Sequence, residues 1–162
     1  MDFPDNHHLS SALGWLELGN MTEAWVEMEK LSSGGRTKIE ALTVSWKIFA
    51  SQERWEEAVN MGREMVRTAP SITEGWINRS FALHEMRRTA EARAELLPAV
   101  EWFPKEPIIP YNLACYACQL GDMEAASRWF SEAVKRGGAK KMKAMGLDDP
   151  DLLPMKEEIR KL

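Results

Sequence analysis

Residues 111–126 read YNLACYACQLGDMEAA, and this stretch decides the fold. Its first half is a continuous apolar run that is typical of a buried helix. Gly121-Asp122 ends that run, because glycine commonly follows the last residue of a helix and aspartate commonly caps the next one. The stretch therefore predicts two helices joined by a tight turn.

The same pattern recurs along the chain at a fixed interval. Alanines in a similar acidic context lie 34 residues apart, at Ala24, Ala58, Ala92 and Ala126. Pro70 and Pro104 are separated by the same step. A constant interval of this length indicates a repeat protein in which each unit is one pair of helices.

Two helices are therefore expected in each repeat. Their predicted ranges are 6–18, 21–32, 38–51, 54–68, 72–86, 89–103, 107–120 and 123–136. Gly19-Asn20 and Gly121-Asp122 supply a glycine stop before a capping residue. The matching turns at Glu53-Arg54 and Arg87-Arg88 must form without glycine.

Two places depart from a regular array. Pro98 falls inside the helix expected over 89–103 and should kink it, because proline has no backbone N–H to donate. Residues 32–35, Ser-Ser-Gly-Gly, stand where later repeats have proline, and they are predicted to be the loosest joint.

The chain resembles the tetratricopeptide repeat family over roughly residues 5–138. The fourth repeat carries the likeness best, through Tyr111, Gly121, Ala126 and Phe130. The resemblance implies an all-α fold: a right-handed superhelical array of helix-turn-helix units (an α-solenoid) with a C-terminal capping helix. The expected organisation is a single domain, 1–162, with units at about 5–38, 39–72, 73–106 and 107–138 and a cap at 139–162.

The cap is expected because the last repeat of such an array exposes an apolar face. Residues at helical spacing that suit a lid are Leu152, Leu153, Met155, Ile159 and Leu162. The Asp-Pro-Asp-Leu stretch at 149–152 resembles the closing segment of many bacterial tetratricopeptide proteins. That likeness implies a bacterial source and a complete C-terminal end.

Composition excludes several functional classes. The 162 residues carry a formal net charge of −4, which argues against a general nucleic-acid binder. No apolar run is long enough for a membrane span, and the acidic start lacks the features of a secretory signal. We therefore expect no nucleic acid or membrane partner and a cytoplasmic location.

The residues that bear reactive chemistry do not assemble into a catalytic or metal motif. Cys115 and Cys118 form a C-x-x-C, but they fall well inside a helix rather than at its N-terminus, where a redox pair works. No second ligand pair for zinc lies at a suitable spacing. We therefore predict no cofactor, no metal and no enzyme activity, with both cysteines packed in the helix.

The resemblance also implies that first helices line a concave groove in which a partner binds. Leu9, Leu13 and Leu16 form a stripe on one side of the first helix. Adding the interval predicts a largely apolar groove, and our candidate partner-binding residues are Lys47, Ile77, Asn78, Phe81, His84, Tyr111 and Asn112.

Asn78 and Asn112 lie 34 residues apart in this groove. Each side-chain amide could donate to and accept from a peptide backbone, as asparagines do in peptide-binding members of the family. The alternative is that both amides satisfy neighbouring backbone groups.

These expectations favour a non-enzymatic adaptor or scaffold that binds a protein or peptide segment. A secretion-type chaperone that holds a client protein is an alternative. Self-association into a homo-oligomer through the stripe of Leu9, Leu13 and Leu16 is another.

Overall fold

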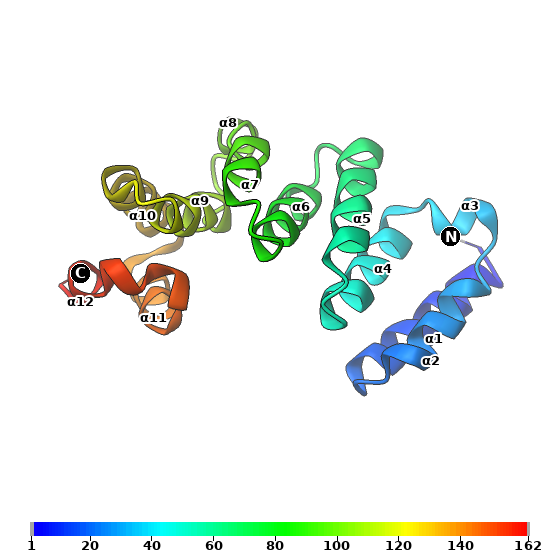
Figure 1. Cartoon of the computed structure of the whole chain (residues 1–162). Coiled ribbons are helices and arrows are strands. Elements are labelled where there is room, and N and C mark those ends of the chain that lie inside the picture. Colours follow the sequence, from blue (N-terminus) through cyan, green and yellow to red (C-terminus); the bar gives the residue numbers. More distant parts are fainter. Residues whose placement is uncertain (1, 162) are drawn as a thin grey trace. The chain divides into compact units, whose positions relative to one another are not determined.

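The computed structural model describes residues 2–161, which form helices joined by short turns (Figure 1). Within those residues there is no strand, so the predicted all-α class is confirmed. The elements are α1 (Asp5–Glu17), α2 (Met21–Glu29), α3 (Ser33–Arg36), α4 (Ile39–Ser51), α5 (Trp55–Thr68), α6 (Thr73–Glu85), α7 (Thr89–Leu96), α8 (Ala99–Trp102), α9 (Ile108–Gln119), α10 (Met123–Gly137), α11 (Ala139–Asp148), the 3-10 helix η1 (Pro150–Met155) and α12 (Lys156–Arg160).

The chain divides into two compact units, and the boundary falls within α6. Unit 1 is Met1–Ala82 and unit 2 is Leu83–Leu162. The organisation of the chain as a single domain, with the repeat boundaries given above, stays a prediction.

Most of the predicted helix ends agree with the structure to within one residue, because the pair of helices recurs at the 34-residue interval. Pro98 has a larger effect than the expected kink. It ends the regular hydrogen bonding after Leu96, and α8 starts only at Ala99. α2 ends at Glu29, three residues before its predicted end.

The joint after α2 is more ordered than the sequence suggested. Residues 33–36 form α3, and the Ser32 hydroxyl accepts a hydrogen bond from the Gly35 amide at 2.9 Å. The Arg36 Nε donates to the Leu31 carbonyl at 3.0 Å. Side-chain hydrogen bonds thus hold a stretch that lacks the proline of later repeats.

The turn inside each repeat uses one left-handed residue. Gly19 and Gly121 have φ values of 75° and 79°. Glu53 and Arg87 occupy the same place in the interval and adopt φ values of 56° and 63°. The glycine-free turns therefore keep the backbone shape of the others, at the steric cost that a Cβ atom brings in this region.

Glu53→Gly should relieve that cost and raise the free energy of unfolding by about 0.5–1 kcal/mol, after allowing for the greater freedom of glycine in the unfolded chain. Urea denaturation measures the change. Ala94→Gly, on the exposed side of α7, is the control and should lose about 1 kcal/mol. A destabilised Glu53→Gly protein would contradict the explanation.

In unit 1, α5 and α6 approach each other through two glycines. A Cβ atom on Gly62 would lie 2.7 Å from the Cα of Arg79. A Cβ atom on Gly75 would lie 3.0 Å from the Cβ of Met65. Larger residues at these places would force the two backbones apart.

Gly62→Ala should therefore destabilise the protein by about 1–3 kcal/mol, because the added methyl group meets backbone rather than a movable side-chain end. Gly14→Ala is the matched control, since a Cβ there would meet nothing within 4 Å. The control should be neutral or gain up to about 1 kcal/mol from better helix propensity. Thermal unfolding of both variants tests the difference.

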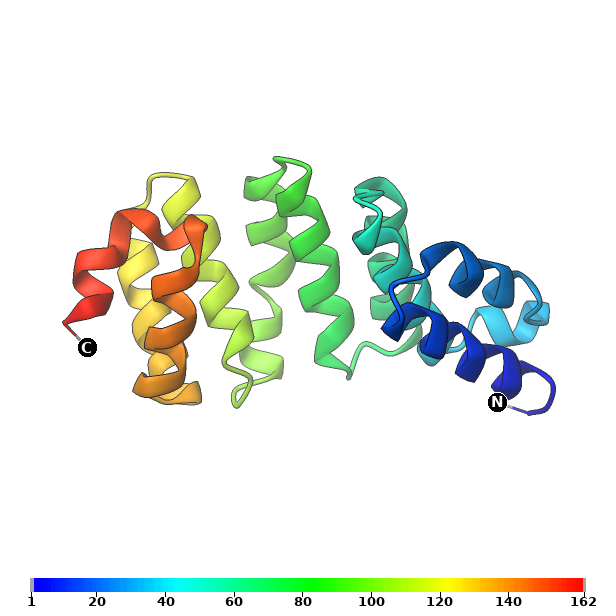
Figure 2. The ribbon, with the colours of Figure 1, turned by 90° about the horizontal axis from the view of Figure 1, so that it is seen from below.

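In unit 2, α9 packs against α10 and α7, and the C-terminal elements return onto this core. η1 lies on α9, while α11 lies beside α10 (Figure 2). Leu152, Met155 and Ile159 are buried as predicted for a lid. Leu153 was also expected there, but its side chain is 63% exposed. Leu162 lies outside the described residues.

Candidate partner-binding surface

The predicted first-helix face is hollowed in unit 1. Residues of α1, α4 and the start of α6, with Ile72 just before it, line an open hollow of about 300 Å³. Its lining is mostly apolar and consists of Leu9, Leu13, Ile39, Glu40, Thr43, Val44, Lys47, Ile72 and Glu74. We call these residues the unit 1 groove.

The helical repeat explains why these side chains meet. Leu9 and Leu13 are one turn apart on α1, so they share one face. Thr43 and Lys47 occupy the same two places on α4, one interval later. α1 packs against α4, which brings the two faces together.

Three charged side chains are among those that line the unit 1 groove. The Lys47 side chain is exposed on α4. Glu40 and Glu74 stand in the first turns of α4 and α6, where a carboxylate is favoured by the helix dipole. The groove thus combines an apolar floor with one cation and two anions.

The other candidate residues of unit 1 lie on α6. Ile77 and Asn78 are half-buried. Phe81 is 38% exposed, and its ring centroid lies 6.4 Å from that of Trp46 and 6.0 Å from that of Trp55. Phe81 is therefore partly held by two tryptophans and keeps a surface that a partner could contact.

Two candidate residues of unit 2 are covered by the chain's own C-terminal segment. The Tyr111 hydroxyl donates to the Asp149 carboxylate at 2.7 Å. The His84 Nε2 lies 2.9 Å from the Asp151 carboxylate, and its Nδ1 lies 2.9 Å from the Thr89 hydroxyl. Tyr111 is 5% exposed and His84 is 7% exposed. The polar groups of both side chains are therefore already engaged within the chain, and little of either side chain is exposed.

Asp149 organises this contact. One of its oxygens accepts from Tyr111 and from the Cys115 thiol, at 2.7 and 3.6 Å. The other accepts from the backbone amide of Asp151 at 2.9 Å and so caps η1. Gln119 adds a hydrogen bond from its amide to the Asp151 carbonyl at 3.0 Å.

Burial and this carboxylate keep the donors protonated. Burial raises the pKa of the Tyr111 hydroxyl, and the hydrogen bond to Asp149 raises it further. Burial likewise raises the pKa of the Cys115 thiol well above its ordinary value, with a further contribution from the charge of Asp149. Both groups therefore remain hydrogen-bond donors to Asp149 near neutral pH.

Asp149→Ala should leave the buried Tyr111 hydroxyl without its acceptor and remove the cap of η1. We expect a loss of about 1–3 kcal/mol in the free energy of unfolding and faster amide exchange at residues 151–153 and 155. Asp148→Ala, at the exposed neighbouring position, should change stability by less than about 0.5 kcal/mol. Equal effects of the two changes would show that the Asp149 contacts do not contribute to the stability of the protein.

The remaining predicted residues of unit 2 lie on α9. Asn112 is half-buried. Cys115 and Cys118 are both buried, which confirms that they pack inside the helix. In the part of the chain that the structure describes, no cluster of three or more histidine, cysteine or acidic side chains could hold a metal ion. Nor does any helix among residues 2–161 have the length and hydropathy to cross a membrane.

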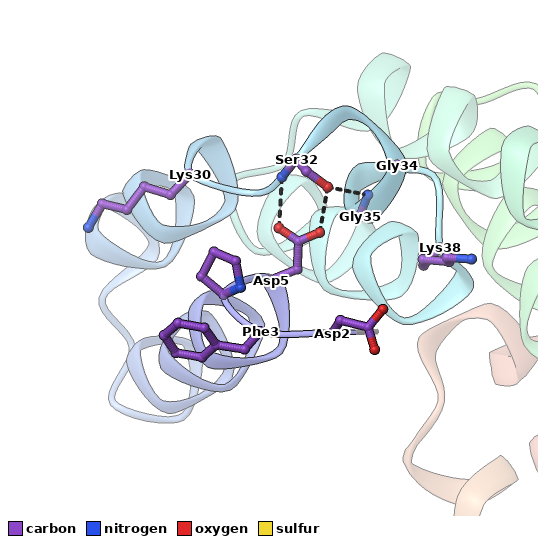
Figure 3. A pocket seen from close by; sticks show the side chains of 9 residues that line it. Asp2, Phe3, Asp5, Lys30, Ser32, Gly34, Gly35 and Lys38 are labelled. Atoms are coloured by element: carbon purple, nitrogen blue, oxygen red, sulfur yellow. Dashed lines mark hydrogen bonds between the residues drawn. The ribbon is translucent and has the colours of Figure 1, made fainter.

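A second hollow lies at the start of unit 1 (Figure 3). There the Asp5 carboxylate accepts hydrogen bonds from the Ser32 amide at 2.8 Å and from its hydroxyl at 2.5 Å. These bonds lower the pKa of Asp5. A Cβ atom on Gly35 would lie 2.2 Å from the carboxylate. The Asp5 carboxylate of this hollow is therefore already used to join α1 to Ser32, the residue that caps α3.

Sequence reasoning missed the position of the C-terminal segment. It predicted a lid over the last repeat but did not place the lid on the first-helix face of α9. The signal was present in Asp149 and Asp151, two carboxylates on either side of a proline. These two carboxylates could have been recognised as hydrogen-bond partners for Tyr111 and His84, which had been assigned to the groove.

No protein-family model and no curated protein matches the chain. Solved structures match over most of its length. A MamA double mutant has a TM-score of 0.73 at 13% identity and covers 90% of this chain and 79% of its own. A thermophilic tetratricopeptide repeat protein of Thermus thermophilus has a TM-score of 0.70 at 16% identity, with coverage of 99% and 83%.

YrrB, described as a tetratricopeptide repeat protein with an unusual peptide-binding site, has a TM-score of 0.69 at 13% identity. It covers 95% of this chain and 84% of its own. At these identities the likeness shows the fold. The chain has the helical-repeat fold of the tetratricopeptide proteins, as the 34-residue interval predicted.

Proposed function

We propose that this chain is a non-enzymatic scaffold that binds a short segment of another protein in the unit 1 groove. The observation that carries the proposal is the apolar hollow of about 300 Å³ between α1, α4 and the start of α6. Hollows of this size, lined by aliphatic side chains with a few charged groups at the edge, suit a small number of partner side chains.

The kind of function is supported by the fold. The fold is that of proteins whose helical arrays serve protein interaction, and YrrB is described as having a peptide-binding site. The likeness names no partner for this chain. An adaptor role and a client-holding chaperone role both use the same surface, so the proposal covers the binding step that they share.

Within the proposal, each candidate residue has a defined place. Lys47, Leu9 and Leu13 all line the groove. Phe81 and Asn78 on α6 extend the contact within unit 1, Phe81 with its exposed ring and Asn78 with its amide. We do not extend the proposal to Tyr111 and His84, because the C-terminal segment covers them.

Site-specific photo-crosslinking in the native cell tests the face. A photoreactive phenylalanine at position 13 or 43 should crosslink to a partner, because both positions line the groove. The same residue at position 63, on the exposed side of α5, is the control and should not.

Leu13→Asp, introduced together with the probe at position 43, should reduce that crosslink at least about tenfold, since a charge in an apolar contact is costly. Circular dichroism must show that the variant stays folded. A crosslink that forms from position 63 and not from positions 13 and 43 would place the interface on the other face.

A further inference from the structure

The unit 1 groove is the counterpart of a surface that already holds a peptide segment in unit 2. Thr43 and Lys47 on α4 precede Tyr111 and Cys115 on α9 by two intervals of the repeat. Tyr111 and Cys115 are the residues that contact Asp149 of the C-terminal segment. The chain therefore shows, within itself, what this face of a first helix can bind.

The segment held in unit 2 has a simple chemistry. A carboxylate, Asp149, receives the hydrogen bonds of the two side chains on α9. Three residues later Leu152 is fully buried. Asp149 and Leu152, close together in sequence, thus fix the segment against α9, and the Asp151 carboxylate makes a further contact with His84 at the end of α6.

Thr43 and Lys47 in unit 1 can bind a carboxylate more strongly than Tyr111 and Cys115 do, because Lys47 carries a positive charge. Thr43 stands at the repeat position of Tyr111 and also carries a hydroxyl, which lies next to the backbone and not at the end of a ring. Lys47 offers an ammonium group where Cys115 offers a weak thiol donor. The two stand at i and i+4 on α4 and so share one face. A charge-assisted hydrogen bond from lysine is stronger than a neutral one.

The remaining charges limit how acidic the bound segment can be. Glu40 and Glu74 line the same hollow as Lys47. A segment with several carboxylates would meet repulsion from these two side chains. A segment with a single carboxylate, placed at Lys47, avoids it and leaves the aliphatic floor for apolar side chains.

We infer that the ligand of the unit 1 groove is a short protein segment with one carboxylate followed within a few residues by aliphatic side chains. The carboxylate binds Thr43 and Lys47, and the aliphatic side chains pack on Leu9, Leu13 and Ile72. The inference rests on the proposed function and names the partner class for the same groove.

Two synthetic peptides, acetylated and amidated, provide the probes. Both derive from the chain's own sequence DPDLLPM at 149–155. The first, DPNLLPM, keeps one carboxylate, and the second, NPNLLPM, keeps none. Fluorescence anisotropy of labelled peptides with the full chain at low ionic strength gives both dissociation constants.

Wild-type protein should bind DPNLLPM at least about threefold more tightly than NPNLLPM, as for one partly exposed charged pair. Lys47→Met should abolish this preference and leave NPNLLPM binding unchanged. Lys30→Met, an exposed lysine of unit 1 outside the groove, is the matched control and should retain the preference. Leu13→Ala should weaken both peptides by a similar factor.

The outcomes separate this inference from the proposal on which it rests. If wild-type protein bound the two peptides equally and Leu13→Ala weakened both, the inferred role of the carboxylate would be wrong, but binding in the unit 1 groove would be supported. No binding of either peptide at about 1 mM, the weak end of measurable affinity, would overturn the partner class, while the crosslinks at positions 13 and 43 decide the groove independently. A preference that survives Lys47→Met and grows in Asp149→Ala, which frees the donors Tyr111 and Cys115 for the carboxylate of the peptide, would place the peptide on α9 and also overturn the inference.

Discussion

The close approach of paired helices through alanine is the constraint on which the rest of the structure depends. Alanines at the 34-residue interval are fully buried on each second helix, at Ala24, Ala58, Ala92 and Ala126. In the first repeat, Ala24 of α2 shares one core cluster with Ala12 of α1. Any larger side chain would have to separate the two helices. Because the two helices of a repeat are fixed in this way, every first helix presents the same repeat positions on the side that faces away from its second helix.

This repeated face is covered by the C-terminal segment in unit 2 and is open in unit 1. In unit 2 it carries Tyr111 and, from the end of α6, His84, whose polar groups need partners once they are buried. Asp149 and Asp151 supply those partners, and the C-terminal segment closes over the helix. In unit 1 the face carries the exposed Lys47 at the edge of an aliphatic floor. A lysine ammonium keeps its hydration at low cost, so the face needs no cover from the chain itself.

Much of the fold could be predicted because its causes are local. The interval, the glycine stops and the capping residues fixed most of the helix ends, and even the turns at Glu53 and Arg87 follow the glycine-containing ones. The candidate site was harder to predict. The interval led to Lys47, which lines a hollow on the first-helix face. A periodic pattern cannot predict where the C-terminal segment folds back, because that segment is not part of the repeat. The burial of Tyr111 depends on Asp149, 38 residues away, and on a 3-10 turn that has no counterpart in the repeats.

Binding chemistry on this fold is therefore separable from its stability. The alanines that set the helix spacing lie on second helices, whereas the groove residues lie on first helices and at the turn before α6. A change at Lys47 alters a surface that contributes little to the core, because the Lys47 side chain is exposed. The same change at Cys115 would disturb a buried contact with Asp149. Equivalent positions in the interval thus differ in tolerance, and the tolerant ones, in unit 1, are where a partner preference can be altered without loss of the fold.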